Sequence, residues 1–137
     1  MIGERQAILD AVGRTLETHA PEVIAAYVFG SVGRGEHRDS SDVDVGVIRT
    51  RGMAGTGSFS GLPLDLEGEL ERALGRTVQV VTLETAPPDL VHRVLRDGAI
   101  VVDRDRAARV RFEVRARNEY FDILPRLEEY RRARSTP

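Results

Sequence analysis

A glycine–serine pair, followed at a fixed distance by two aspartates, is the part of the sequence best suited to chemistry. The pair is Gly30-Ser31, and the aspartates, Asp42 and Asp44, are two positions apart. Glycine lets the backbone approach a bulky anion closely and the serine hydroxyl adds a donor, so the pair suits phosphate. Alternate residues of a strand face the same side, so the two carboxylates would repel each other unless they shared a hard cation such as Mg2+. The pattern therefore predicts a phosphate cradle beside a magnesium site.

Each half of this pattern taken alone also fits an ordinary turn or a solvated strand face. The complete pattern is Gly-Ser, ten residues, then Asp-x-Asp. At average residue usage it should arise by chance in about 0.2–0.5% of chains of this length. The joint occurrence therefore favours a functional site.

The same residues resemble the signature of the DNA polymerase β-like nucleotidyltransferase superfamily. Within this superfamily, the chain resembles the minimal nucleotidyltransferases (MNT), the antitoxin halves of HEPN/MNT toxin–antitoxin pairs. The resemblance lies in its short length, the Arg34-Gly35 pair and the ten-residue spacer between Ser31 and Asp42, residues 32–41. This resemblance implies Mg2+-dependent transfer of AMP from ATP to a tyrosine of a partner HEPN ribonuclease, which silences the toxin. It also implies that Gly30 and Ser31 hold the triphosphate and that Asp42 and Asp44 bind the metal.

One position departs from the family pattern. The family usually carries a third carboxylate in the next strand, in a run Val-Asp-Val-Val, and the matching run here is Val78-Gln79-Val80-Val81. A glutamine can orient a nucleophile but cannot accept its proton, and loss of a general base costs on the order of 10²–10⁴ in rate. A tyrosine acceptor, whose pKa is about 10, needs less assistance than an aliphatic alcohol. Glu84 should face the opposite side and not compensate; a shifted strand register is the alternative explanation.

Two residues of the spacer are open to two interpretations. The guanidinium of Arg34 suits phosphate, but a solvated loop arginine fits equally well. His37 could touch a nucleotide, although a solvated loop histidine is the simpler interpretation. The other histidines, His19 and His92, have no metal-ligand spacing.

Composition removes several classes of function. The 137 residues include no cysteine, which excludes disulfides, thiolate zinc sites and thiol nucleophiles. All 20 basic residues are arginine, which excludes Schiff-base chemistry and a P-loop lysine. The net charge of −2 gives no general attraction to nucleic acid, and no apolar run is long enough for a membrane span. We expect a cytoplasmic protein that makes no direct contact with nucleic acid or membrane.

Hydrophobic periodicity predicts one α/β domain over residues 1–137, with a small mixed sheet flanked by helices. Gly75 should end the second helix, and Pro125 should kink the last one. The expected helices cover residues 3–19, 62–74, 87–98 and 104–134, the expected strands cover 23–30, 42–48, 77–83 and 99–103, and a glycine-rich loop covers 49–60.

The C-terminal helix offers a second candidate surface. It carries ten arginines against six acidic residues, whereas its apolar stripe from Val110 to Leu127 is expected to face the core. A long terminal helix of this kind suits either a solvated face or a docking surface for a partner.

Two classes of function therefore remain open: a protein adenylyltransferase, and a degenerate module that neutralises its partner by binding alone. A small-molecule nucleotidyltransferase is disfavoured because the chain has no residues for a separate acceptor domain.

Overall fold

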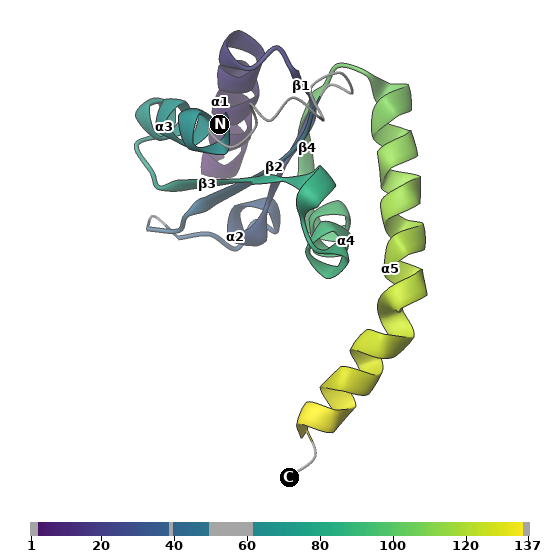
Figure 1. Ribbon diagram of the computed structural model, residues 1–137. Helices are drawn as coiled ribbons and strands as arrows, with labels where there is room; N and C mark the ends of the chain where they lie inside the picture. Colours follow the sequence, from purple (N-terminus) through teal and green to yellow (C-terminus); the bar gives the residue numbers. More distant parts are fainter. Residues whose placement is uncertain (1–2, 39, 50–61, 136–137) are drawn as a thin grey trace.

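The computed structural model describes residues 3–38, 40–49 and 62–135. Helices cover both faces of a four-stranded sheet, and a long C-terminal helix runs along one side (Figure 1). The elements in chain order are α1 (Glu4–His19), β1 (Val23–Phe29), α2 (Gly30–Gly33), β2 (Val43–Arg49), α3 (Leu62–Leu74), β3 (Val78–Thr82), the 3-10 turn η2 (Leu83–Thr85), α4 (Pro88–Asp97), β4 (Ala99–Asp103) and α5 (Arg106–Ser135).

The sheet is mixed, as the sequence predicts. Its strand order is β3-β2-β1-β4, with β2 parallel to β3 and β1 antiparallel to both β2 and β4. The two central strands, β1 and β2, are packed on both faces. This explains why the segment Val-Ile-Ala-Ala-Tyr-Val-Phe is apolar throughout instead of alternating.

Alternate residues of the strands enter two separate cores. Val43, Val45 and Val47 of β2 pack beneath α1 and α3, whereas Ile48 belongs to the core under α4 and α5. Figure 1 shows these two helix pairs on opposite sides of the sheet. Asp44 alternates with the valines, so its side chain lies on the α4 side.

The predicted helix boundaries are confirmed at two positions. Gly75 follows α3 with φ at +67°, the left-handed conformation expected of a glycine that ends a helix. Pro88 is the first residue of α4 and Pro87 is its N-cap, positions at which a missing backbone N–H is harmless. The expected glycine-rich loop begins at Arg49, which is the last residue of β2, and its remaining residues, 50–60, lie outside the described residues.

The prediction that the apolar stripe of α5 faces the core is wrong. Val110, Val114 and Phe121 are 41%, 48% and 60% exposed, whereas Phe112 and Ala116 are the buried residues of this helix. The face that meets the sheet also contains charged residues, which a hydrophobic pattern assigns to solvent.

A buried polar network fixes that inner face to the sheet. The Tyr27 hydroxyl donates to Glu113 Oε2 at 2.7 Å, and Arg109 Nη1 lies 2.9 Å from the same oxygen. Arg109 Nε lies 3.0 Å from Asp103 at the end of β4. Burial, reinforced by the bond to Glu113, raises the pKa of Tyr27 above its ordinary value. The network therefore anchors the first half of α5 to β1 and β4.

No helix among residues 3–38, 40–49 and 62–135 has the length and apolar character needed to cross a membrane.

Candidate active site

The predicted glycine–serine pair follows β1 directly and forms the first two residues of the four-residue helix α2. Gly30 has φ at +68°, and a Cβ added there would overlap the carboxylate of Asp44. At the other end of α2, a Cβ on Gly33 would lie 2.6 Å from the carbonyl oxygen of Val28. Both glycines are therefore required by close contacts, and the first brings the backbone of α2 directly against a strand carboxylate.

Gly30→Ala should destabilise the protein and weaken nucleotide binding. The positive φ alone costs an alanine about 1–2 kcal/mol, and the overlap with Asp44 adds to this. Gly75→Ala is the matched control, because Gly75 has φ at +67° with no atom within 4 Å of an added Cβ. Chemical denaturation should show a larger loss of unfolding free energy for Gly30→Ala than for Gly75→Ala. Equal losses would mean that the Asp44 contact is unimportant.

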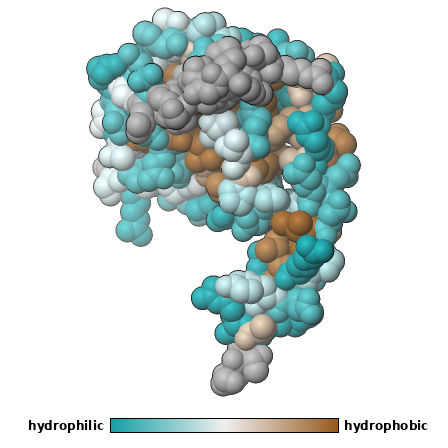
Figure 2. Space-filling view, viewed as in Figure 1, coloured by the Kyte–Doolittle hydropathy of each residue, from teal (hydrophilic) through white to brown (hydrophobic). Residues whose placement is uncertain are grey.

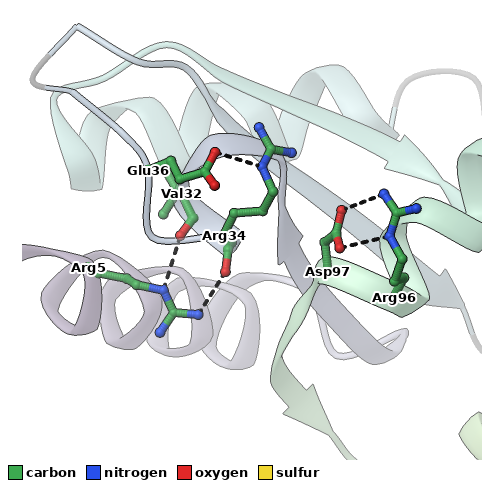
Figure 3. A network of polar contacts seen from close by, with 7 residues as sticks. Arg5, Val32, Arg34, Glu36, Arg96 and Asp97 are labelled. Atoms are coloured by element: carbon green, nitrogen blue, oxygen red, sulfur yellow. Dashed lines mark hydrogen bonds and ion pairs between the residues drawn. The ribbon is translucent and has the colours of Figure 1, made fainter.

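Arg5 of α1 holds the C-terminal end of α2 (Figure 3). Its Nε donates to the carbonyl oxygen of Val32 at 3.1 Å, and its Nη2 donates to that of Gly33 at 2.9 Å. Arg5 could not be identified from the sequence, because a charge near the start of an amphipathic helix has no local feature that marks a contact 27 residues away.

A second set of contacts holds the spacer that leads to β2. Arg76 Nη1 donates to the carbonyl oxygens of Arg38 and Ser41 at 3.0 and 3.2 Å, and its Nη2 pairs with Glu4. His37 Nε2 lies 3.7 Å from the Glu4 carboxylate, with its side chain only 10% exposed. The simpler interpretation of His37 as a solvated histidine is therefore wrong, because it is packed against the start of α1.

Strand pairing places Asp44 and Gln79 side by side. Asp44 pairs with Phe29 of β1 on one side and with Gln79 of β3 on the other. The strand register assumed in the sequence analysis therefore holds, and the glutamine occupies the position next to the strand aspartate. Glu84 does not replace a carboxylate there, because it lies in η2 and its Oε2 accepts the backbone N–H of Arg49 at 2.9 Å.

The two aspartates differ in environment. Asp42 is exposed and precedes β2 by one residue, whereas Asp44 is half-buried within the strand. Burial raises the pKa of the Asp44 carboxyl above its ordinary value, and the charge of Asp42 raises it further, while Arg34 lowers it. The ionised form of Asp44 is thus disfavoured by burial and by repulsion from Asp42, and a bound cation would stabilise it.

A cleft of about 300 Å³ lies beside Asp44. Of the predicted site residues, the lining includes Gly30, Arg34, Asp44 and Gln79, whereas Ser31 and Asp42 lie outside it. The rest of the lining consists of Phe29, Val81, Leu90, Arg93, Arg96 and Asp97. The three charged residues of α4 were missed, although two arginines at i and i+3 on an amphipathic helix could have signalled a shared face.

The donors present fit a hard divalent cation. Asp42 and Asp44 provide carboxylate oxygens, which such ions prefer. Within the described part of the chain, no group of three or more acidic, histidine or cysteine side chains gathers as a metal site. A cation held by these two aspartates would therefore take further ligands from nucleotide phosphates and water.

The first strand of the mixed sheet is followed by a short glycine-containing helix, and this helix lies against an aspartate of the neighbouring strand. This arrangement is the fold of a nucleotidyltransferase. Residues 12–107 match the family model described as Polymerase beta, Nucleotidyltransferase, and the chain belongs to that family.

Solved structures share this fold over nearly the whole chain. A toxin–antitoxin crystal structure with AMP-PNP matches with a TM-score of 0.78 and 20% identity, covering 93% of this chain and 98% of that chain. A complex of tri-AMPylated HEPN toxin with MNT antitoxin from Shewanella oneidensis matches with a TM-score of 0.74 and 18% identity, covering 96% and 99%.

A structure described as a putative minimal nucleotidyltransferase is 29% identical, with a TM-score of 0.56, and the match covers 71% of this chain and 95% of that chain. A comparison with curated protein sequences gives no significant match.

Proposed function

We propose that this protein is an antitoxin that transfers AMP from Mg-ATP to a tyrosine of a partner HEPN toxin. In this reaction the tyrosine oxygen forms a bond to the α-phosphorus of ATP. The bond from that phosphorus to the bridging oxygen breaks, pyrophosphate leaves, and the phenolic proton is released. The proposal treats residues 1–137 as one cytoplasmic domain.

One contact carries the proposal. The Asp44 carboxylate lies against the backbone of Gly30, so an anion-binding turn and a cation-binding group face the same cleft. The fold is also shared with structures whose descriptions name an MNT antitoxin, an AMPylated HEPN toxin and AMP-PNP. Nucleotide, toxin and adenylyl group thus all occur among proteins of this fold.

Each site residue has a defined task in this reaction. The first amide groups of α2 and the Ser31 hydroxyl bind phosphate oxygens, because the first amides of a helix have no acceptor within the helix. Asp42 and Asp44 would hold Mg2+, and the bound ion would supply positive charge to the phosphates of the nucleotide. Gln79, adjacent to Asp44, orients the tyrosine hydroxyl. Since an amide cannot take up the proton, the proton passes to solvent.

The position of Gln79 also favours a second candidate function. A site that lacks its base next to Asp44 could persist as a nucleotide-binding or inactive module, and the protein would then neutralise its partner by binding alone. The two functions predict different masses for the bound toxin.

Intact mass spectrometry of the co-purified toxin separates the two functions. After incubation with ATP and Mg2+, we expect a gain of one or more AMP units, which a chelator should prevent, as should replacement of ATP by α,β-methylene-ATP, whose α–β bridge has no oxygen to leave. An unchanged toxin mass, with the complex still intact, would refute adenylyl transfer and leave neutralisation by binding.

We propose that the outer face of α5 contacts this toxin. The face carries the exposed Val110, Val114 and Phe121, and the exposed arginines 106, 111, 115 and 117 lie in the same half of the helix. The only acidic residue between positions 106 and 118 is Glu113, whose side chain is 12% exposed and is engaged in the buried network. Figure 2 shows apolar residues at the surface of the protruding part of α5. An acidic toxin surface with apolar side chains would complement this face.

Substitution of the outer face should weaken the complex. Val114→Ser combined with Phe121→Ser should lower affinity for the toxin by about tenfold or more, because both side chains would lose buried contact area. Ile100→Ser is the control, since Ile100 is 47% exposed but lies on β4. Binding can be measured by surface plasmon resonance with immobilised toxin. Equal effects of the two variants would exclude α5 as the preferred contact.

A further inference from the structure

One wall of the cleft is formed by arginines that the proposed mechanism has not used. Arg93 and Arg96 of α4 line the same cleft as Gly30 and Asp44, and Arg34 lies there after α2. Three guanidinium groups thus share the lining with two carboxylates, those of Asp44 and Asp97. The chain as a whole has a net charge of −2, so this local excess of positive charge runs against its composition. Such a wall suits an anion.

The arginines differ in how they are held. Arg96 donates through Nε and Nη2 to the two carboxylate oxygens of Asp97, both at 2.9 Å, in a paired geometry visible in Figure 3. Arg34 Nε lies 3.2 Å from Glu36. Arg93 has no carboxylate partner within residues 3–38, 40–49 and 62–135. The wall therefore combines an arginine paired with a carboxylate and one that has no such partner among the described residues.

The arginines of α4 lie next to α2, at the glycine–serine end of the predicted site. A Cβ on Gly33 would lie 3.3 Å from the carbonyl oxygen of Asp97, so the end of α4 lies against α2. Gln79 is on the opposite side of Asp44, on the edge strand β3. Because the acceptor must approach the α-phosphorus opposite the leaving group, an acceptor beside Gln79 directs the leaving group toward α2 and α4.

We propose that Arg93 and Arg96 bind the two phosphates of ATP that leave as pyrophosphate, and that Asp97 is a positioning residue for Arg96. This inference rests on the proposed function and extends it to the leaving group. Planar guanidinium groups match phosphate oxygens in pairs, and the bond to Asp97 sets the plane of Arg96 before the nucleotide arrives.

Comparison of ligands with and without these phosphates tests the inference. Isothermal titration of the full chain in Mg2+ would use ATP, AMP and inorganic pyrophosphate with Arg93→Ala, Arg96→Ala and the double variant. Arg72→Ala is the matched control, because Arg72 is exposed on α3 and its partner among the described residues is Glu69, one turn away. We expect the double variant to lose about 10–100-fold in affinity for ATP and pyrophosphate, with AMP affinity changed less than about twofold.

Asp97→Asn tests the positioning role. It should lower ATP and pyrophosphate affinity by less than Arg96→Ala does, and it should have no further effect when Arg96 is already alanine. A general structural defect would instead weaken AMP binding in parallel.

Three outcomes would overturn the inference. The double variant could lose affinity for ATP and AMP equally, or its affinity for ATP and pyrophosphate could be unchanged. The third outcome is that neither ATP nor pyrophosphate binds to the unsubstituted chain. The measurement does not depend on catalysis. If ATP binds through these arginines but no AMP reaches the toxin, adenylyl transfer fails while the phosphate site remains.

Discussion

Asp44→Asn should reduce AMP transfer to the toxin by at least about 10²-fold while leaving the complex intact. The amide keeps the shape of the side chain against Gly30 but removes the charge that holds the cation. The loss of the several kcal/mol of transition-state stabilisation that a metal ion supplies corresponds to a factor of this size. The rate would be followed by the intact mass of the toxin at fixed times after ATP addition.

The same substitution should not destabilise the metal-free protein. The pKa of Asp44 is raised in the folded state by burial and by Asp42. Its favourable contribution to stability is therefore present at low pH and is lost as pH rises through the folded pKa. At neutral pH an uncharged asparagine should fold at least as well, so the loss of transfer cannot be attributed to unfolding. Asp10→Asn, at an exposed position of α1, is the charge-matched control and should transfer normally. Normal transfer by Asp44→Asn would exclude Asp44 as a metal ligand.

Gln79→Asp should accelerate transfer, by up to about 10²–10⁴-fold if proton removal limits the rate. Gln79 is exposed and directly adjacent to Asp44, so a carboxylate there could accept the phenolic proton and contribute a metal ligand. The rate of this variant should also rise with pH through the pKa of the new carboxyl. Initial rates of toxin modification at several pH values measure both effects.

Gln79→Asn is the control for the shortened side chain, because it changes the size in the same way without adding a base. We expect it to be no faster than the unsubstituted protein. If Gln79→Asp and Gln79→Asn behave alike, the residue beside Asp44 has no part in proton transfer, and the phenolic proton leaves by another route.

The sequence predicted those parts of the site that depend on local pattern. Gly30-Ser31 was placed directly after a strand by its local pattern. Gln79 was assigned to the site by the resemblance to the nucleotidyltransferase pattern, and β3 pairs with β2 so that Gln79 lies next to Asp44. The mixed sheet and the order of helices followed from hydrophobic periodicity. The glycine–serine pair and the order of elements depend on residues close together in the chain.

Contacts between distant elements could not be predicted in this way. Arg5 reaches α2, Arg76 reaches the spacer, and Arg93 and Arg96 meet the cleft only after α4 has packed on the sheet. The face of α5 was assigned incorrectly for a related reason. The sequence marked the apolar stripe as the inner face, whereas the ion pairs of Arg109 allow a partly charged face to pack inward.

Pro125 divides α5 into two segments with different relations to the rest of the molecule. A proline inside a helix removes one backbone hydrogen bond, and Figure 1 shows a change of direction in the C-terminal part of this helix. The segment before the proline is tied to β1 and β4 by Tyr27 and Arg109, so it unfolds together with the sheet. The segment after it has mostly exposed side chains and can open without the sheet unfolding. Opening of this second segment therefore leaves intact both the cooperative stability of the domain and the outer face before Pro125 that we propose contacts the toxin.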